Sequence, residues 1–155
     1  MNLRSIQRSI QCGGAALFIF VITWLAALPA RARANPIADW DVIAFAAVEA
    51  SGKTGPVTAC DVAMAHVAMY DALNAIDRRY EPYAYNAVAP YGASPEAAVA
   101  AAAHDVLIVR IPNQKASLVA ALASALAAIP DGPAKTEGVA TGGIAGDGVD
   151  PRLAE

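Results

Sequence analysis

The two histidines of this 155-residue chain are the side chains best suited to chemistry, and the first of them belongs to a polar stripe. His66, Tyr70 and Asn74 are spaced four residues apart, so on a helix they lie along one face. Such a stripe suits a polar site between helices, with His66 as base or ligand, or a set of interhelical hydrogen bonds. We favour the hydrogen bonds, because one histidine without a second ligand on the same helix is a weak indication of metal binding.

The second histidine, His104, is followed directly by Asp105. Adjacent residues of a helix point about 100° apart, so we predict that these two do not form an acid–base pair. His104 could meet His66 across a bundle and hold a metal with an acid, but the spacing does not establish that geometry. We therefore expect a structural histidine in the core or at its edge, and the sequence assigns no catalytic, cofactor-binding or metal-binding residue.

Three further patterns have ordinary structural explanations. Gly52-Lys53-Thr54 resembles the end of a phosphate-binding loop, but Ala47 stands where that motif needs glycine, so we predict a helix-ending turn. Residues 147–151 lack the regular oxygen ligands of a calcium loop and are predicted to form a turn. Cys60 is the only cysteine after residue 34, and inside an apolar helix it is expected to be a small buried side chain.

The first 34 residues have the pattern of a secretory signal. Arg4 and Arg8 precede an apolar run over residues 13–28, and Ala32-Arg33-Ala34 is a cleavage pattern, with residues 30–32 as a second possible site. An uncleaved membrane anchor is the competing interpretation, but the run is shorter than the roughly 20 residues that span a bilayer. We expect a periplasmic or secreted protein without a stable membrane span after cleavage.

Composition excludes some classes of partner and structure. Hydrophobic residues make up 57% of the chain and charged residues 16%, which is unlike a disordered protein. Seven of the eleven basic residues and all fourteen acidic residues follow residue 34, so residues 35–155 carry a net charge of about −7. No basic surface for nucleic acid is indicated.

Alanine fills 32 of the 121 positions after residue 34, and strand-like alternation is missing, so the expected fold is all-α. We predict an antiparallel bundle of four to five helices over residues 35–136. The expected helices cover residues 37–50, 58–77, 95–110 and 113–129, with a fifth beginning near residue 134.

The details of these elements follow from local signals. The start of the second helix, Thr58 to Asp61, looks like a capping box, and Val62, His66, Met69, Leu73 and Ile76 define its expected buried face. Tyrosines 80, 83, 85 and 91 are expected to pack the following linker onto the helices. Each of five glycines after residue 137 destabilises a helix by about 1 kcal/mol relative to alanine. Residues 137–155 are therefore predicted to be a frayed, Gly-rich tail.

Several stretches together resemble bacterial vanadium-dependent haloperoxidase-like proteins of the type 2 phosphatidic-acid phosphatase superfamily. Residues 64–76, which contain His66-Val-Ala-Met-Tyr-Asp-Ala-Leu-Asn-Ala-Ile76, resemble an early helix of that family. Residues 37–40, 94–104 and 127–136 resemble its mature start and its next helices, in the same order. The resemblance covers roughly residues 36–136 and consists of packing and turn motifs.

The resemblance implies an all-helical fold and, for the whole family, a vanadate or phosphate site. Its members bind the oxyanion with a Lys and Arg pair, a Pro-Ser-Gly-His loop and an Arg followed by His. This chain has no Arg-Pro pair, no Ser-Gly-His and no Arg followed within six residues by His. We therefore expect the exported N-terminal helical portion of such a protein, without cofactor and inactive alone, whose partner is a missing C-terminal catalytic half or a second copy. The alternative is a free-standing periplasmic helical binding or interaction module.

Overall fold

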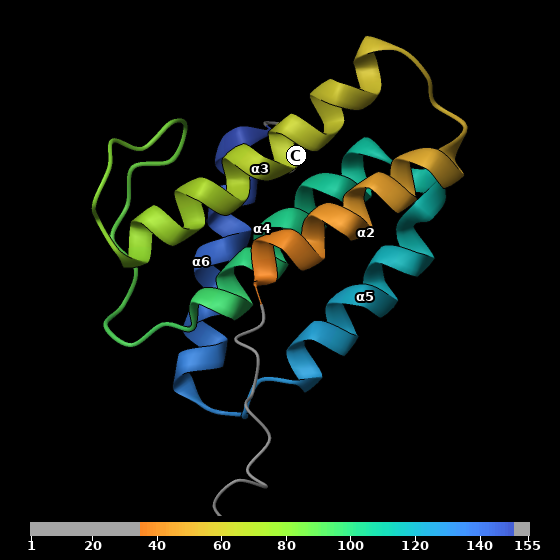
Figure 1. Cartoon of the computed structure of the whole chain (residues 1–155). Helices are drawn as coiled ribbons and strands as arrows, with labels where there is room; N and C mark the ends of the chain where they lie inside the picture. Colours follow the sequence, from red (N-terminus) through yellow and green to blue (C-terminus); the bar gives the residue numbers. More distant parts are fainter. Residues whose placement is uncertain (1–34, 151–155) are drawn as a thin grey trace, which may run out of the picture. The chain divides into compact units, whose positions relative to one another are not determined.

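The structure is a computed structural model that describes residues 35–150. The described residues contain five α-helices, one 3-10 turn and no strand, which confirms the all-α prediction (Figure 1). The elements are α2 (Pro36–Ser51), α3 (Pro56–Ile76), α4 (Pro95–Arg110), η1 (Pro112–Gln114), α5 (Lys115–Ala127) and α6 (Pro133–Val149). The predicted signal at residues 1–34 lies outside the described residues.

Local sequence signals account for the ends of two helices. The Asn35 side chain caps α2 by accepting from the Ala38 N–H at 3.4 Å, and Gly52 ends that helix in the left-handed region at φ 72°. The Ser94 hydroxyl caps α4 by accepting from the Ala97 N–H at 3.2 Å, and Pro95 occupies the first helical position. The turn predicted at Gly52 and the bounds predicted for the 95–110 helix are therefore confirmed.

Helix α4 lies in the middle of the fold, and its small side chains determine how closely the other helices approach it. Ten of its sixteen residues are buried, and six of these are alanines. It packs against α6, α3 and α5, most extensively against α6 (Figure 1). Larger side chains, including Trp40, Met69, Leu107 and Leu118, fill the space between α4 and the other helices.

The contact between α4 and α6 is close because α6 presents glycine to it. A methyl group built at Gly138 would lie 2.5 Å from the Ser94 carbonyl oxygen, and one built at Gly142 would overlap the backbone oxygen of Ala98. The two helices run parallel, since the Ser94 N–H donates to the Ala134 carbonyl at one end and Arg110 pairs with Asp150 at the other.

The prediction of a frayed tail from residue 137 is therefore wrong for residues 137–149, which form most of α6. Intrinsic helix propensity disfavours each glycine, but the absence of a side chain allows α6 to pack directly onto the backbone of α4. The turn predicted at residues 147–151 is also wrong at its start. Residues 147–149 belong to α6, and Asp150 is its buried C-cap.

The buried face of helix α3 differs from the face predicted for it. Val62 and Met69 are buried as expected, but His66, Leu73 and Ile76 are only partly buried. The rest of the buried face consists of small and polar residues: Ala65, Ala68, Ala72, Ala75, Asp61, Asp71 and Asn74. Apolar spacing could not identify this face, because two of its most buried members are carboxylates.

The loop after α3 is not held by its aromatic side chains as predicted. Tyr80, Tyr83 and Tyr91 are exposed, and only Tyr85 packs against the core. Cys60 is likewise exposed rather than buried.

Helix α5 is shorter than the predicted 113–129 segment, because η1 precedes it and Ala127 ends it. Leu118 is its one fully buried residue. No single helix of the described range is long and apolar enough to cross a membrane; α4 with η1 and α5 reaches that length only as a pair bent by 119°.

Candidate functional site

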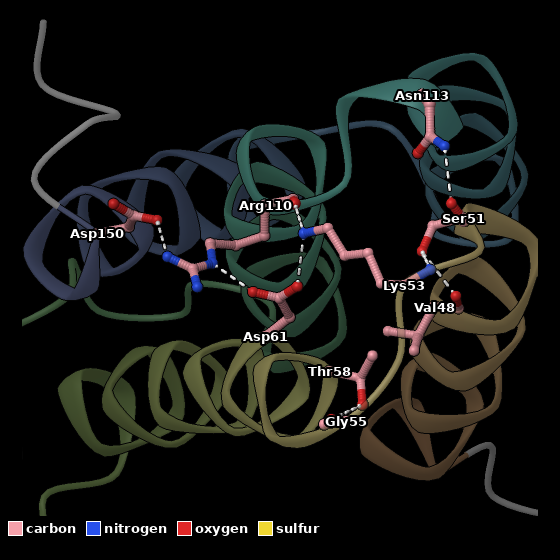
Figure 2. A network of polar contacts seen from close by, with 9 residues as sticks. All are labelled: Val48, Ser51, Lys53, Gly55, Thr58, Asp61, Arg110, Asn113 and Asp150. Carbon is pink, nitrogen blue, oxygen red and sulfur yellow. Dashed lines mark hydrogen bonds and ion pairs between the residues drawn. The ribbon is translucent and has the colours of Figure 1, made fainter.

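An ion-pair cluster of two buried carboxylates and two partly exposed cations joins four segments at one end of the fold. We call Lys53, Asp61, Arg110 and Asp150 the Asp61 cluster (Figure 2). The fully buried Asp61 carboxylate accepts from Lys53 Nζ at 2.8 Å and from Arg110 Nε at 2.6 Å. Arg110 also pairs with the Asp150 carboxylate at 3.7 Å. The cluster thus connects α3 with the α2–α3 turn, the end of α4 and the end of α6.

Local structure directs Lys53 into this cluster. The Ser51 hydroxyl donates to the Val48 carbonyl at 2.7 Å and accepts from the Lys53 N–H at 3.2 Å, which shapes the turn after α2 (Figure 2). The Lys53 ammonium then donates to the Arg110 carbonyl as well as to Asp61. Lys53 therefore satisfies a carboxylate and an otherwise unpaired carbonyl at the end of α4.

The charges of the Asp61 cluster balance, with two basic and two acidic side chains. Breaking a buried ion pair by removing one partner typically costs about 3–5 kcal/mol, because it leaves a buried charge uncompensated. The cluster is therefore a structural clamp, and its cations are committed to its own carboxylates.

Asp61 was predicted to lie at the start of a helix, and that prediction is wrong. Helix α3 begins at Pro56 after Gly55, so Asp61 lies more than a turn inside the helix. Its partner Arg110 is 49 residues away in sequence. The available signal was an acid among apolar helical residues, which must be paired if it is buried.

Of the stripe of His66, Tyr70 and Asn74, only His66 forms a hydrogen bond to another helix of the described residues. His66 Nε2 lies 2.9 Å from the Asp41 carboxylate on α2. The Tyr70 hydroxyl donates to the Glu81 carbonyl at 2.8 Å. Asn74 holds the backbone of Tyr80 through two hydrogen bonds, at 2.7 and 3.0 Å. Two of the three side chains therefore bind the loop, and not a neighbouring helix as predicted.

Asp71 is the strongest anchor of the same loop. Its buried carboxylate accepts three backbone hydrogen bonds, from Tyr83 and Ala84 at 2.7 Å and from Tyr85 at 2.8 Å. This role of Asp71 was not predictable from the sequence, because backbone donors leave no trace in side-chain spacing.

His104 forms the pair that its sequence position was predicted to prevent. Its Nδ1 lies 2.7 Å from the Asp105 carboxylate, because two neighbouring side chains on one helix can lean toward each other. The residue is buried, as a core histidine would be, and its Nε2 has no hydrogen-bond partner among the described residues. Each histidine thus pairs with its own carboxylate. Within residues 35–150, no three His, Cys, Asp or Glu side chains are grouped to hold a metal.

A pocket of about 490 Å³ opens beside α3, next to the anchored loop. Its apolar lining includes Ile37, Met69, Leu73 and Ile76, and His66 also lines it. A second, more open hollow of about 510 Å³ adjoins it and shares His66 and Tyr70.

Two tyrosines and an ion pair also line the 490 Å³ pocket beside α3. The rings of Tyr70 and Tyr80 lie 6.5 Å apart and are tilted by 33°. Arg79 donates to the Asp77 carboxylate at 2.8 Å, and this hydrogen bond with its opposite charge raises the pKa of the Arg79 guanidinium above its ordinary value. The pocket therefore combines an apolar floor and an aromatic wall with a set of polar side chains, a combination that small-molecule sites use.

Comparison of the chain with protein-family models, with curated proteins and with solved structures gives no match.

Proposed function

We propose that this chain is an exported, helical, non-catalytic portion of a haloperoxidase- and acid-phosphatase-like protein, and that it binds neither vanadate nor phosphate by itself. The motifs at residues 37–40, 64–76, 94–104 and 127–136 support the lineage. The Asp61 cluster is the observation on which the absence of oxyanion binding rests.

The cluster brings a lysine and an arginine together, as an oxyanion site would require, but it neutralises both. Catalytic oxyanion sites aim uncommitted donors at the developing charge. Here Lys53 Nζ and Arg110 Nε donate to the buried Asp61 carboxylate, at 2.8 and 2.6 Å. An incoming oxyanion would have to displace that carboxylate and leave it buried without a partner, which is costly.

The same proposal includes export and the arrangement of the helices. Asn35, which directly follows the expected cleavage site, caps the first described helix. We propose cleavage after Ala34 and an antiparallel arrangement of consecutive helices. N-terminal sequencing of the protein isolated from the periplasm tests the cleavage: a first residue of Asn35 is expected, and Met1 would refute it.

The test of the functional proposal is a bromide-oxidation assay with vanadate and hydrogen peroxide, together with vanadium NMR of the purified chain. We expect no turnover and an unshifted vanadate resonance. Turnover, or a vanadate signal broadened by the protein, would refute the proposal. The Lys53→Met variant serves as the control, because a signal that persists in it would not come from the Asp61 cluster.

The pocket beside α3 favours a second candidate function, a free-standing helical binding module. Its volume of about 490 Å³ is within the range of small-molecule sites. A free-standing module should be monodisperse, as monomer or homodimer, and should unfold cooperatively. An orphaned half of an enzyme should instead bind hydrophobic dyes and lose cooperative unfolding.

A further inference from the structure

Several polar side chains line the pocket beside α3, and His66 is the histidine among them. The Asn74 amide is hydrogen-bonded to the Tyr80 backbone, and Asp77 and Arg79 form an exposed ion pair at the rim. His66 is committed through only one ring nitrogen, since its Nε2 lies 2.9 Å from the Asp41 carboxylate. The nitrogen that remains for a ligand is Nδ1.

The Asp41 contact determines what that nitrogen can do. An ionised carboxylate only accepts hydrogen bonds, so Nε2 carries the proton of the neutral ring. Nδ1 is then an acceptor, because the hydrogen bond of one ring nitrogen sets the tautomer of the other. A ligand at this position must therefore offer a donor, such as a hydroxyl group.

The other walls of the pocket select for a flat, apolar body. Tyr70 and Tyr80 present two tilted rings 6.5 Å apart, and aromatic rings pack against such faces in offset or edge-on geometry. Met69 adds a thioether to the floor, which contacts aromatic edges favourably. Leu73 and Ile76 supply further apolar surface.

We propose that this pocket binds a small aromatic molecule that carries a hydroxyl group. The hydroxyl donates to His66 Nδ1, and the ring packs against Tyr70, Tyr80 and the apolar floor. This inference deepens the second candidate function and rests on it, whereas the absence of oxyanion binding rests on the separate Asp61 cluster.

Three probes of similar size test the hydrogen-bond direction at pH 8: p-cresol, 4-methylanisole and 4-methylbenzoate. Binding to the purified chain is measured by NMR titration. We expect p-cresol to bind about fivefold to tenfold more tightly than 4-methylanisole, which has the same ring but no donor. Equal binding of these two, tighter binding of 4-methylbenzoate, or no binding of p-cresol would each overturn the proposal.

A variant locates the interaction. His66→Leu should lower the affinity for p-cresol to that for 4-methylanisole and should leave the affinity for 4-methylanisole unchanged. If the variant still binds p-cresol more tightly than 4-methylanisole, the hydroxyl does not donate to His66. His66 is partly exposed and its recorded partner is the surface residue Asp41, so circular dichroism should report an intact fold. Tyr91→Phe, on a fully exposed side chain outside the pocket, is the control and should change neither affinity. If His66→Leu fails to fold, the comparison of the three probes on the unaltered chain still decides the matter.

Discussion

The contact of α4 with α6 and the contact of α3 with its following loop are stabilised in different ways. Between α4 and α6, glycine and alanine bring two backbones together, and Gly138 and Gly142 have no room for a methyl group. Between α3 and residues 77–94, polar side chains such as Asp71 and Asn74 hold loop backbone, while the loop tyrosines stay largely exposed. The first contact leaves no space for a ligand, and the second borders a pocket. Close backbone packing thus supplies the rigid body, and side-chain hydrogen bonds shape the surface that can bind.

The largest expected effect comes from adding one methyl group to the α4–α6 contact. Gly142→Ala places a methyl group onto the backbone oxygen of Ala98, which no side-chain rotation can relieve. We expect a loss of about 2–3 kcal/mol in the free energy of unfolding, despite the better helix propensity of alanine. Urea unfolding followed by circular dichroism measures this loss.

The neighbouring Gly143 provides the matched control for that variant. A methyl group there meets only the end of the Asp105 side chain, at 3.4 Å. Gly143→Ala should therefore leave stability unchanged or raise it by up to about 1 kcal/mol. If both variants lose the same stability, steric contact with α4 is not the cause.

A smaller and more local effect is expected on the loop side. Asp71→Ala removes the acceptor of three loop N–H groups and should lower the free energy of unfolding by about 2 kcal/mol. This loss is smaller than that of three fully buried hydrogen bonds, because the N–H groups of the freed loop can bind water. Hydrogen exchange should speed up at Tyr83, Ala84 and Tyr85, while α4 remains protected.

The exposed Asp77 at the end of the same helix is the control for this variant. Asp77→Ala removes one surface ion pair and should change stability by less than about 0.5 kcal/mol. Unchanged exchange at residues 83–85 in Asp71→Ala would contradict the anchoring role.

The smallest expected effect comes from removing a surface ion pair at the start of α6. Lys135 donates to Asp131 at 2.9 Å, and this hydrogen bond with its opposite charge lowers the pKa of Asp131 below its ordinary value. The pair therefore stabilises the fold above the ordinary carboxyl pKa of about 4, and this contribution is lost as the pH falls through the lowered value.

Lys135→Met should return the pKa of Asp131 toward its ordinary value, as read from NMR titration of its carboxyl carbon. Lys115→Met, at an exposed residue on α5, should leave the titration unchanged. An Asp131 titration that is identical in the unaltered chain and in Lys135→Met would show that the pair does not form in solution.

Helix α4 was predictable because its signals are local. Ser94 and Pro95 start it, Pro112 follows its end, and the alanines between them favour helix. Helix α6 was predicted to begin near residue 134, but its continuation past residue 137 was not predicted, because the helix propensity of glycine does not include the surface of α4. The candidate pocket was not predictable, since Ile37 and Ile76 lie far apart in sequence.

The sequence by itself determined that this chain is helical, where α2 and α4 begin and end, and which residues carry polar chemistry. These properties depend on propensities and caps that act within a few residues. Only the tertiary structure decided that Asp61 neutralises Lys53 and Arg110, that Asp71 holds a loop, and that Gly142 touches the α4 backbone. Those contacts join residues far apart in the chain, and their energies arise from burial and pairing that exist only after the helices have packed.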